Sequence, residues 1–331
     1  MSFDPVVQAV RQAVRLCRTV QQQSFRSAAK TSLEKETTEP VTIADYGSQA
    51  LICRTLQQHF PQDAVVAEEA GSQFLTLLDV GQQSRVAALI GDILGEPVTV
   101  EQVLSWLDFG TDHDPLAGRT WVIDPIDGTK GFIAMRHYAV GVGVLERGQL
   151  TGAIMAAPGY GDSDSDDGGV IFIAQDGQAT MEPIAGGAPQ PIHPSLRTDP
   201  ASMHIVQSYE KEHVSKSRLQ RVYERAGLAQ ARLTDLDSME KYGLIACGDA
   251  DVLMRLPQRG STRPHMIWDH AAGSALVLAA GGRVTDIDGQ PLRFDQGRAL
   301  PHSGMIASSG GDLHDRLVAA AQAVMADENE S

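Results

Sequence analysis

The segment WVIDPIDGTKGF at residues 121–132 restricts the fold and chemistry of this chain more than any other. Its apolar start predicts a buried strand, after which Asp124 and Asp127 stand three residues apart, followed at once by Gly128. Two carboxylates so close together repel each other unless something positive lies between them. A simple Asp-Gly turn is the alternative, but a turn requires only one aspartate. The pair therefore favours a site for a hard cation such as Mg²⁺.

The overall composition limits the possible partners. The chain has 331 residues and a formal net charge of −15, so no surface for nucleic acid or anionic membranes is expected. Its three cysteines are widely spaced and indicate neither a disulfide framework nor a zinc site. The sequence lacks the pattern of a signal peptide and any apolar run of about 18 residues. We therefore expect a cytoplasmic protein that binds a small molecule.

Helical and strand patterns predict an α/β protein with two domains. Residues 1–198 are expected to form a helix and antiparallel-sheet domain, with a helical insertion at 74–118 in which Thr99 and Gln102 form a capping box. The Pro-rich stretch GGAPQPIHPSLRTDP is the candidate boundary. Residues 199–331 alternate strands with helices, which is typical of an α/β domain.

Three further acidic positions lie where predicted strands end or helices start. Asp45 in TIAD could complete a capping box, and Glu68 in AVVAEEA could belong to a solvated loop. Asp269 in IWDHAAG could cap the helix that Gly281 closes. Each explanation suffices alone. Taken with the aspartate pair, however, these positions mark the places where an α/β protein gathers its site.

Four motifs together resemble a known family. VTIAD, VVAEEA, WVIDPIDGTKGF and IWDHAAGSALVLAAGGRVTDIDG occur in this order and are similar to motifs of the inositol monophosphatase superfamily, whose members are lithium-sensitive, magnesium-dependent phosphatases. The resemblance extends from about residue 6 to 310. It implies a layered α-β-α-β-α sandwich, with an α+β first domain, an α/β second domain and a site between them.

Within this superfamily, two stretches resemble the 3′(2′),5′-bisphosphate nucleotidases. Thr129 is followed by Lys-Gly-Phe, whereas inositol monophosphatases typically have Thr followed by Asn at this place. The stretch LDSMEKYGLIACGDADVLMRLP looks like the nucleotide-binding stretch of those nucleotidases. The resemblance implies hydrolysis of the 3′-phosphate of adenosine 3′,5′-bisphosphate, giving AMP. A phosphatase of inositol monophosphate or another sugar phosphate is the alternative. A binding protein without catalysis is a third possibility.

The resemblance also implies roles for individual residues. Two or three Mg²⁺ ions are expected, with these ligands: Glu68, Asp124, the backbone carbonyl of Ile126, Asp127 and Asp269. Thr129 is expected to position the attacking water and to pass its proton toward Asp45. The amides of Gly128 and Thr129 are expected to bind the phosphate. The protein is expected to be a monomer or a homodimer.

The nucleotide is assigned to residues of the second domain. By the same match, Ser238, Lys241 and Arg255 contact the adenosine phosphate, and His213 contacts the adenine. Solvated basic side chains are the alternative for the lysine and the arginine. The chain departs from the nucleotidase pattern at 133–137, at 157–159 and in the acidic run GDSDSDDGG at 161–169. That run does not fit a calcium loop, so a solvated hairpin tip is expected.

Overall fold

The structure is a computed structural model that describes residues 2–28, 39–161, 168–209, 216–257, 264–301 and 304–329. His213 and residues 162–167 of the acidic run lie outside these ranges, so the predictions made for them stay predictions. No helix in the described part of the chain has both the length and the apolar character needed to cross a membrane.

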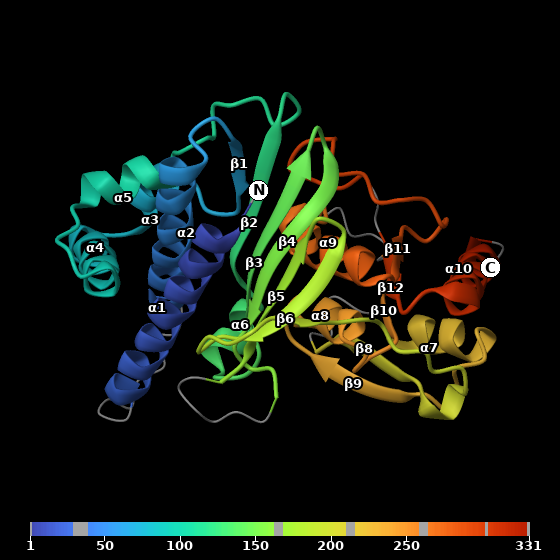
Figure 1. Cartoon of the computed structure of the whole chain (residues 1–331). Helices are drawn as coiled ribbons and strands as arrows, with labels where there is room; N and C mark the ends of the chain where they lie inside the picture. The colour runs from blue at the N-terminus through green and yellow to red at the C-terminus, as the bar shows by residue number, and fades with distance from the viewer. Residues whose placement is uncertain are drawn as a thin grey trace.

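Two β-sheets form the frame of the molecule (Figure 1). The first sheet consists, in spatial order, of β1 (Ala64–Ala67), β2 (Arg119–Asp127), β3 (Ala139–Glu146), β4 (Gln149–Ala157), β5 (Val170–Gln175), β6 (Gln178–Pro183) and β7 (Gln190–Pro191). The second consists of β11 (Arg283–Thr285), β12 (Met305–Ser308), β10 (Val252–Arg255), β8 (His204–Ser208) and β9 (Arg232–Leu236). In the first sheet β1 is parallel to β2 and all other neighbours are antiparallel, whereas β8 in the second is parallel to both β9 and β10.

Helices complete five layers. α1 (Asp4–Ala28) and α2 (Glu39–His59) cover one face of the first sheet, and α8 (Glu240–Ala246) and α9 (Trp268–Ala280) fill the space between the sheets (Figure 1). α7 (Lys216–Arg225) and α10 (Gly311–Asn329) cover the outer face of the second sheet. The order of layers is helix, sheet, helix, sheet, helix, so the predicted α/β sandwich is confirmed.

The predicted insertion at 74–118 is helical over most of its length. α3 (Gly71–Leu77), α4 (Val80–Leu94) and α5 (Val100–Leu107) lie beside α2, and turns follow to the start of β2. The expected capping box of Thr99 and Gln102 is present at the start of α5. The change from one sheet to the other falls between β7 and β8, close to the predicted boundary at residue 198. The domain division itself stays a prediction.

His314 joins the outer helix layer to the second sheet. Its fully buried ring interacts through Nε2 with the Thr285 hydroxyl at 2.9 Å and through Nδ1 with the Ser308 hydroxyl at 2.8 Å. Burial, helped by the nearby Arg283, lowers the pKa of His314 to about 4. The neutral ring is therefore the form that stabilises the fold.

A pH dependence of stability follows. His314 has a pKa near 6.5 in the unfolded chain and near 4 in the folded chain. Its contribution to the stability of the fold is therefore complete above pH 6.5 and is lost as the pH falls toward 4. Between pH 7 and 5 we expect the loss to be about 2 kcal/mol. His314→Gln keeps a neutral side chain. Between pH 7 and 5, its free energy of unfolding, measured with urea, should therefore fall by about 2 kcal/mol less than that of the wild type. Equal losses in the two proteins would contradict the assignment.

Candidate metal centre and active site

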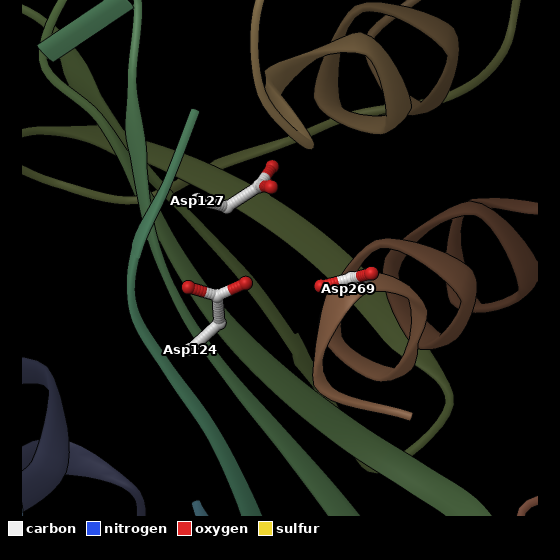
Figure 2. A group of neighbouring side chains, drawn as sticks. All are labelled: Asp124, Asp127 and Asp269. Carbon is white, nitrogen blue, oxygen red and sulfur yellow. The ribbon is translucent and has the colours of Figure 1, made fainter. Parts of the chain in front are cut away.

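An irregularity in β2 brings Asp124 and Asp127 to one side of the sheet. In a regular strand, side chains three residues apart point to opposite faces. Here Asp124 pairs with Gly141 of β3 and Asp127 pairs with Ala139, so the register shifts by one residue between them. Such an extra residue redirects the side chains that follow it. Both carboxylates consequently lie on the side of β2 that faces α9 (Figure 2). Because β2 leads into α6 (Thr129–Ile133), a two-residue hairpin is excluded here.

Asp269 completes a triplet of carboxylates. It lies in the first turn of α9, and the carboxylate oxygens of Asp124, Asp127 and Asp269 all lie within 4.8 Å of one another (Figure 2). α9 can approach the sheet this closely because β3 has glycine at 143, where a Cβ atom would lie 2.7 Å from the Cβ of Ala271. Ile267 occupies the N-cap position of α9, so the alternative that Asp269 only caps the helix is not borne out.

Glu68 lies next to this triplet. β1 runs parallel to β2, and the Glu68 amide, directly after β1, donates to the carbonyl of Ile123 at 3.1 Å. Glu68 thus emerges beside Asp124. Glu68 as a whole is an exposed residue, but desolvation of its carboxylate, and then the neighbouring Glu69, Asp269 and Asp127, raise its pKa to about 7. Burial and the Glu68 charge likewise raise the pKa of Asp124 well above its usual value.

The residues of this cluster fit a divalent cation. Asp124 is 1% exposed, and its Oδ1 has no hydrogen-bond partner among the described residues. A buried carboxylate oxygen without a donor costs free energy that a cation can recover. All the ligand atoms that the cluster offers to a metal are oxygens, which Mg²⁺ prefers. Burial raises the pKa of Asp127, and the positive charges of Lys241 and Arg255 partly offset this rise.

Side chains of α2 form hydrogen bonds with the backbone at the ends of β1 and β2. Ser48 donates to the carbonyl of Pro125 at 3.1 Å, while Gln49 exchanges two hydrogen bonds with the backbone of Glu69, at 2.7 and 3.0 Å. Both side chains are fully buried. We did not single out these two residues in the sequence, although polar side chains within the apolar stripe of a helix are a signal that was available.

Asp45 lies in the second turn of α2. The expectation that it sits at the start of a helix, where it would complete a capping box, is therefore wrong. Asp45 is 8% exposed, and burial, followed by Glu69 and Glu68, raises the pKa of its carboxyl group well above the usual value. α2 also contacts α6, which Thr129 opens. The Thr129 hydroxyl donates to the carbonyl of Ile126 at 3.4 Å.

A segment between β9 and α8 packs directly against the end of β2. The Met239 amide donates to Oδ2 of Asp127. Ser238 packs against Gly128 so closely that a Cβ atom added to this glycine would lie only 2.8 Å from the Cβ of Ser238. Gly128 has a φ of 86°, which also favours glycine. Ser238 has a φ of 67°. The segment predicted to bind nucleotide is thus adjacent to the acidic cluster.

Two basic side chains accompany this segment. Lys241 is 2% exposed, and its ammonium donates to the carbonyls of Leu236, at 2.9 Å, and Ser238. Burial, and then the neighbouring Arg255, lower the pKa of Lys241 to about 8. Arg255, at the end of β10, is partly buried. The alternative that these residues are solvated surface charges is therefore not borne out for the lysine.

Comparison with known proteins agrees with this geometry. The model of the inositol monophosphatase family matches residues 3–326. The chain belongs to the inositol monophosphatase family. The predicted resemblance is thereby confirmed. The family is metal-dependent, in agreement with the carboxylate cluster of this member.

Relatives and solved structures refine the placement within the family. A 3′(2′),5′-bisphosphate nucleotidase of Oryza sativa is 32% identical, covering 98% of this chain and 94% of its own. The corresponding protein of Schizosaccharomyces pombe is 30% identical, covering 98% and 97%. The inositol monophosphatase of Anabaena superposes with a TM-score of 0.61 at 20% identity, covering 97% and 94%, and that of Zymomonas mobilis with 0.62 at 17%, covering 97% and 99%. These two structures show the common fold.

Proposed function

We propose that this chain is a Mg²⁺-dependent phosphatase that hydrolyses the 3′-phosphate of adenosine 3′,5′-bisphosphate to AMP and phosphate. The observation that carries the proposal is the contact between the end of β2 and the segment at 236–241. It places a buried lysine and a nearby arginine beside a carboxylate cluster. A substrate with two phosphates needs two binding regions. The carboxylate cluster with its metal ions would bind the phosphate that is hydrolysed, and the basic side chains would bind the phosphate that is kept. The nucleotidases among the relatives support the same substrate.

Two or three Mg²⁺ ions are assigned to the acidic cluster. Their ligands are Glu68, Asp124, the carbonyl of Ile126, Asp127 and Asp269. When bound, Mg²⁺ supplies positive charge to the phosphate oxygens and makes water more acidic. The chain's own contribution is the arrangement of these oxygens, which Ser48 and Gln49 hold in place. Lithium inhibition is expected for a site of this kind.

Proton transfer is assigned to Thr129 and Asp45. The Thr129 hydroxyl accepts a proton from the attacking water and passes its own toward the Asp45 carboxylate. Burial and two neighbouring glutamates raise the pKa of Asp45, which makes its carboxylate a stronger base. The amides of Gly128 and Thr129 donate to the phosphate oxygens.

The remainder of the substrate is assigned to the second half of the chain. Ser238, Lys241 and Arg255 bind the second phosphate, and His213 contacts the adenine. We propose further that the protein is cytoplasmic, binds neither nucleic acid nor membranes, and is a monomer or a homodimer. Hydrolysis of inositol monophosphate or another sugar phosphate is the alternative activity.

A phosphate-release panel tests the substrate. With saturating Mg²⁺, purified protein is offered adenosine 3′,5′-bisphosphate, adenosine 3′-monophosphate, inositol monophosphate and fructose bisphosphate. We expect the highest kcat/KM for the adenosine bisphosphate. A much higher kcat/KM for inositol monophosphate would replace the proposed substrate by the alternative. Release from none of them would contradict the phosphatase assignment.

Arg255→Leu tests the second phosphate subsite. The variant should lower kcat/KM for adenosine 3′,5′-bisphosphate by about 10- to 100-fold, because a charge-assisted contact to phosphate contributes about 1.5–3 kcal/mol. For adenosine 3′-monophosphate, which lacks that phosphate, the change should stay below about threefold. Arg232→Leu, at an exposed position of β9, is the matched control. Equal losses on both nucleotides would show that Arg255 does not read the second phosphate.

A further inference from the structure

Arg298 connects two segments that each lead into the metal site. Its Nη2 donates to the carbonyl of Ala67 at 2.7 Å, and its guanidinium carbon lies 4.7 Å from the centre of the Trp268 ring. Ala67 directly precedes Glu68, and Trp268 directly precedes Asp269. One side chain therefore contacts the neighbours of two proposed metal ligands that are about 200 residues apart in the sequence.

The backbone around Arg298 is fixed to the same region. The Arg298 carbonyl accepts from the Ile267 amide at 3.0 Å, Ala299 pairs with Met266 in an antiparallel bridge, and the Leu300 amide donates to the His265 carbonyl at 2.8 Å. Trp268 is itself only 6% exposed. The guanidinium thus projects from a fixed backbone toward β1, even though Arg298 as a whole is an exposed residue.

These contacts oppose a force that the site creates. The carboxylates at the ends of β1 and β2 and at the start of α9 repel one another whenever they are ionised. Glu68 directly follows β1 and Asp269 lies in the first turn of α9, so the two carboxylates belong to different layers. The charge-assisted hydrogen bond to Ala67 and the cation–π contact with Trp268 both stabilise this arrangement. Together they can hold the two segments at the spacing that a cation requires.

We propose that Arg298 is a positioning residue that sets the spacing of Glu68 and Asp269 and thereby the Mg²⁺ affinity of the site. The inference rests on the metal centre of the proposed function but not on the identity of the substrate. Partners of this kind, which orient metal ligands without touching the metal, typically contribute 10–100-fold in metal affinity.

The test is calorimetric titration with Mg²⁺ in the absence of substrate. Arg298→Leu is expected to raise the Kd for Mg²⁺ by about 10-fold or more. Arg298→Lys should give an intermediate Kd, because an ammonium can donate to Ala67 but does not stack as a planar guanidinium does. Arg293→Leu is the matched control and should bind within about twofold of the wild type. It changes the same residue type in the same loop, where the arginine forms an exposed salt bridge with Asp295.

The sign of the effect separates positioning from charge. If Arg298 acted only through its charge, its removal would strengthen cation binding, because a cation near the site repels Mg²⁺. Unchanged or tighter binding by folded Arg298→Leu would overturn the proposal. If that variant does not fold, Arg298→Lys decides, and a wild-type Kd there would also overturn it. Failure of the phosphate-release panel with this Kd pattern intact would reject the substrate and leave the positioning role standing.

Discussion

Asp124→Asn is expected to reduce kcat/KM for the preferred nucleotide by at least about 1,000-fold. Asp124 is the most buried member of the carboxylate triplet and is a proposed Mg²⁺ ligand, so its replacement would remove a ligand from the centre of the site. Stabilisation of charge by metal ions contributes several kcal/mol to such a reaction, and each 1.4 kcal/mol is a factor of ten in rate. Phosphate release at saturating Mg²⁺ measures the effect.

The same variant should behave in the opposite way when its stability is measured without metal. Burial and the surrounding carboxylates raise the pKa of Asp124, which means that its charge destabilises the metal-free fold. Replacement by an isosteric amide should therefore raise the free energy of unfolding in EDTA by about 1 kcal/mol or more. Mg²⁺ should stabilise the wild type but not the variant. Asp92→Asn, at an exposed position of α4, is the control and should change neither quantity.

An Asp124→Asn protein that retained wild-type activity in a clean preparation would place the chemistry elsewhere. A variant less stable than the wild type in EDTA would indicate that the carboxylate is satisfied by a donor, in conflict with its unpaired Oδ1. The two readouts are independent, because the first requires substrate and metal and the second requires neither.

Asp45→Asn is expected to lower kcat by about 100- to 10,000-fold, which is the usual contribution of a general base. Its Mg²⁺ Kd should change by less than about threefold, since the proposed role is to accept a proton from Thr129. Thr129→Ala should have a similar effect. If the two residues act as a unit, the double variant should be no slower than the worse single variant.

Multiplicative losses in the double variant would mean that Asp45 and Thr129 act independently. A large rise in the Mg²⁺ Kd of Asp45→Asn would make Asp45 a metal ligand rather than a base. Unchanged kcat would remove Asp45 from the mechanism. Steady-state kinetics at saturating Mg²⁺ and calorimetry without substrate separate these outcomes.

Local patterns predicted the elements of the fold well. The capping box of Thr99 and Gln102 and the closure of α9 by Gly281 were read from the sequence and are present in the structure. The alternation of strands and helices predicted an α/β second domain, whereas the layered sandwich was implied by the resemblance of four motifs. These signals succeed because they depend on residues a few positions apart, where the physics is local.

The arrangement of the site required information that local patterns lack. Nothing in WVIDPIDG shows that one extra residue in β2 turns both aspartates to the same side. Lys241 is buried in α8, which packs against α9, β4 and β10, elements that are distant from one another in the sequence. Arg298 reaches Ala67 across 231 positions. Such contacts depend on how the layers stack, and a periodicity of 2 or 3.6 residues does not encode them.

The central claim is that side chains from β1, β2 and α9 converge to bind divalent cations. Anomalous diffraction from a crystal grown with saturating Mn²⁺ in place of Mg²⁺ tests it most directly. A strong anomalous peak is expected among the carboxylates of Asp124, Asp127 and Asp269, at metal–oxygen distances of about 2.0–2.3 Å. A well-ordered crystal with no peak among these oxygens would contradict it.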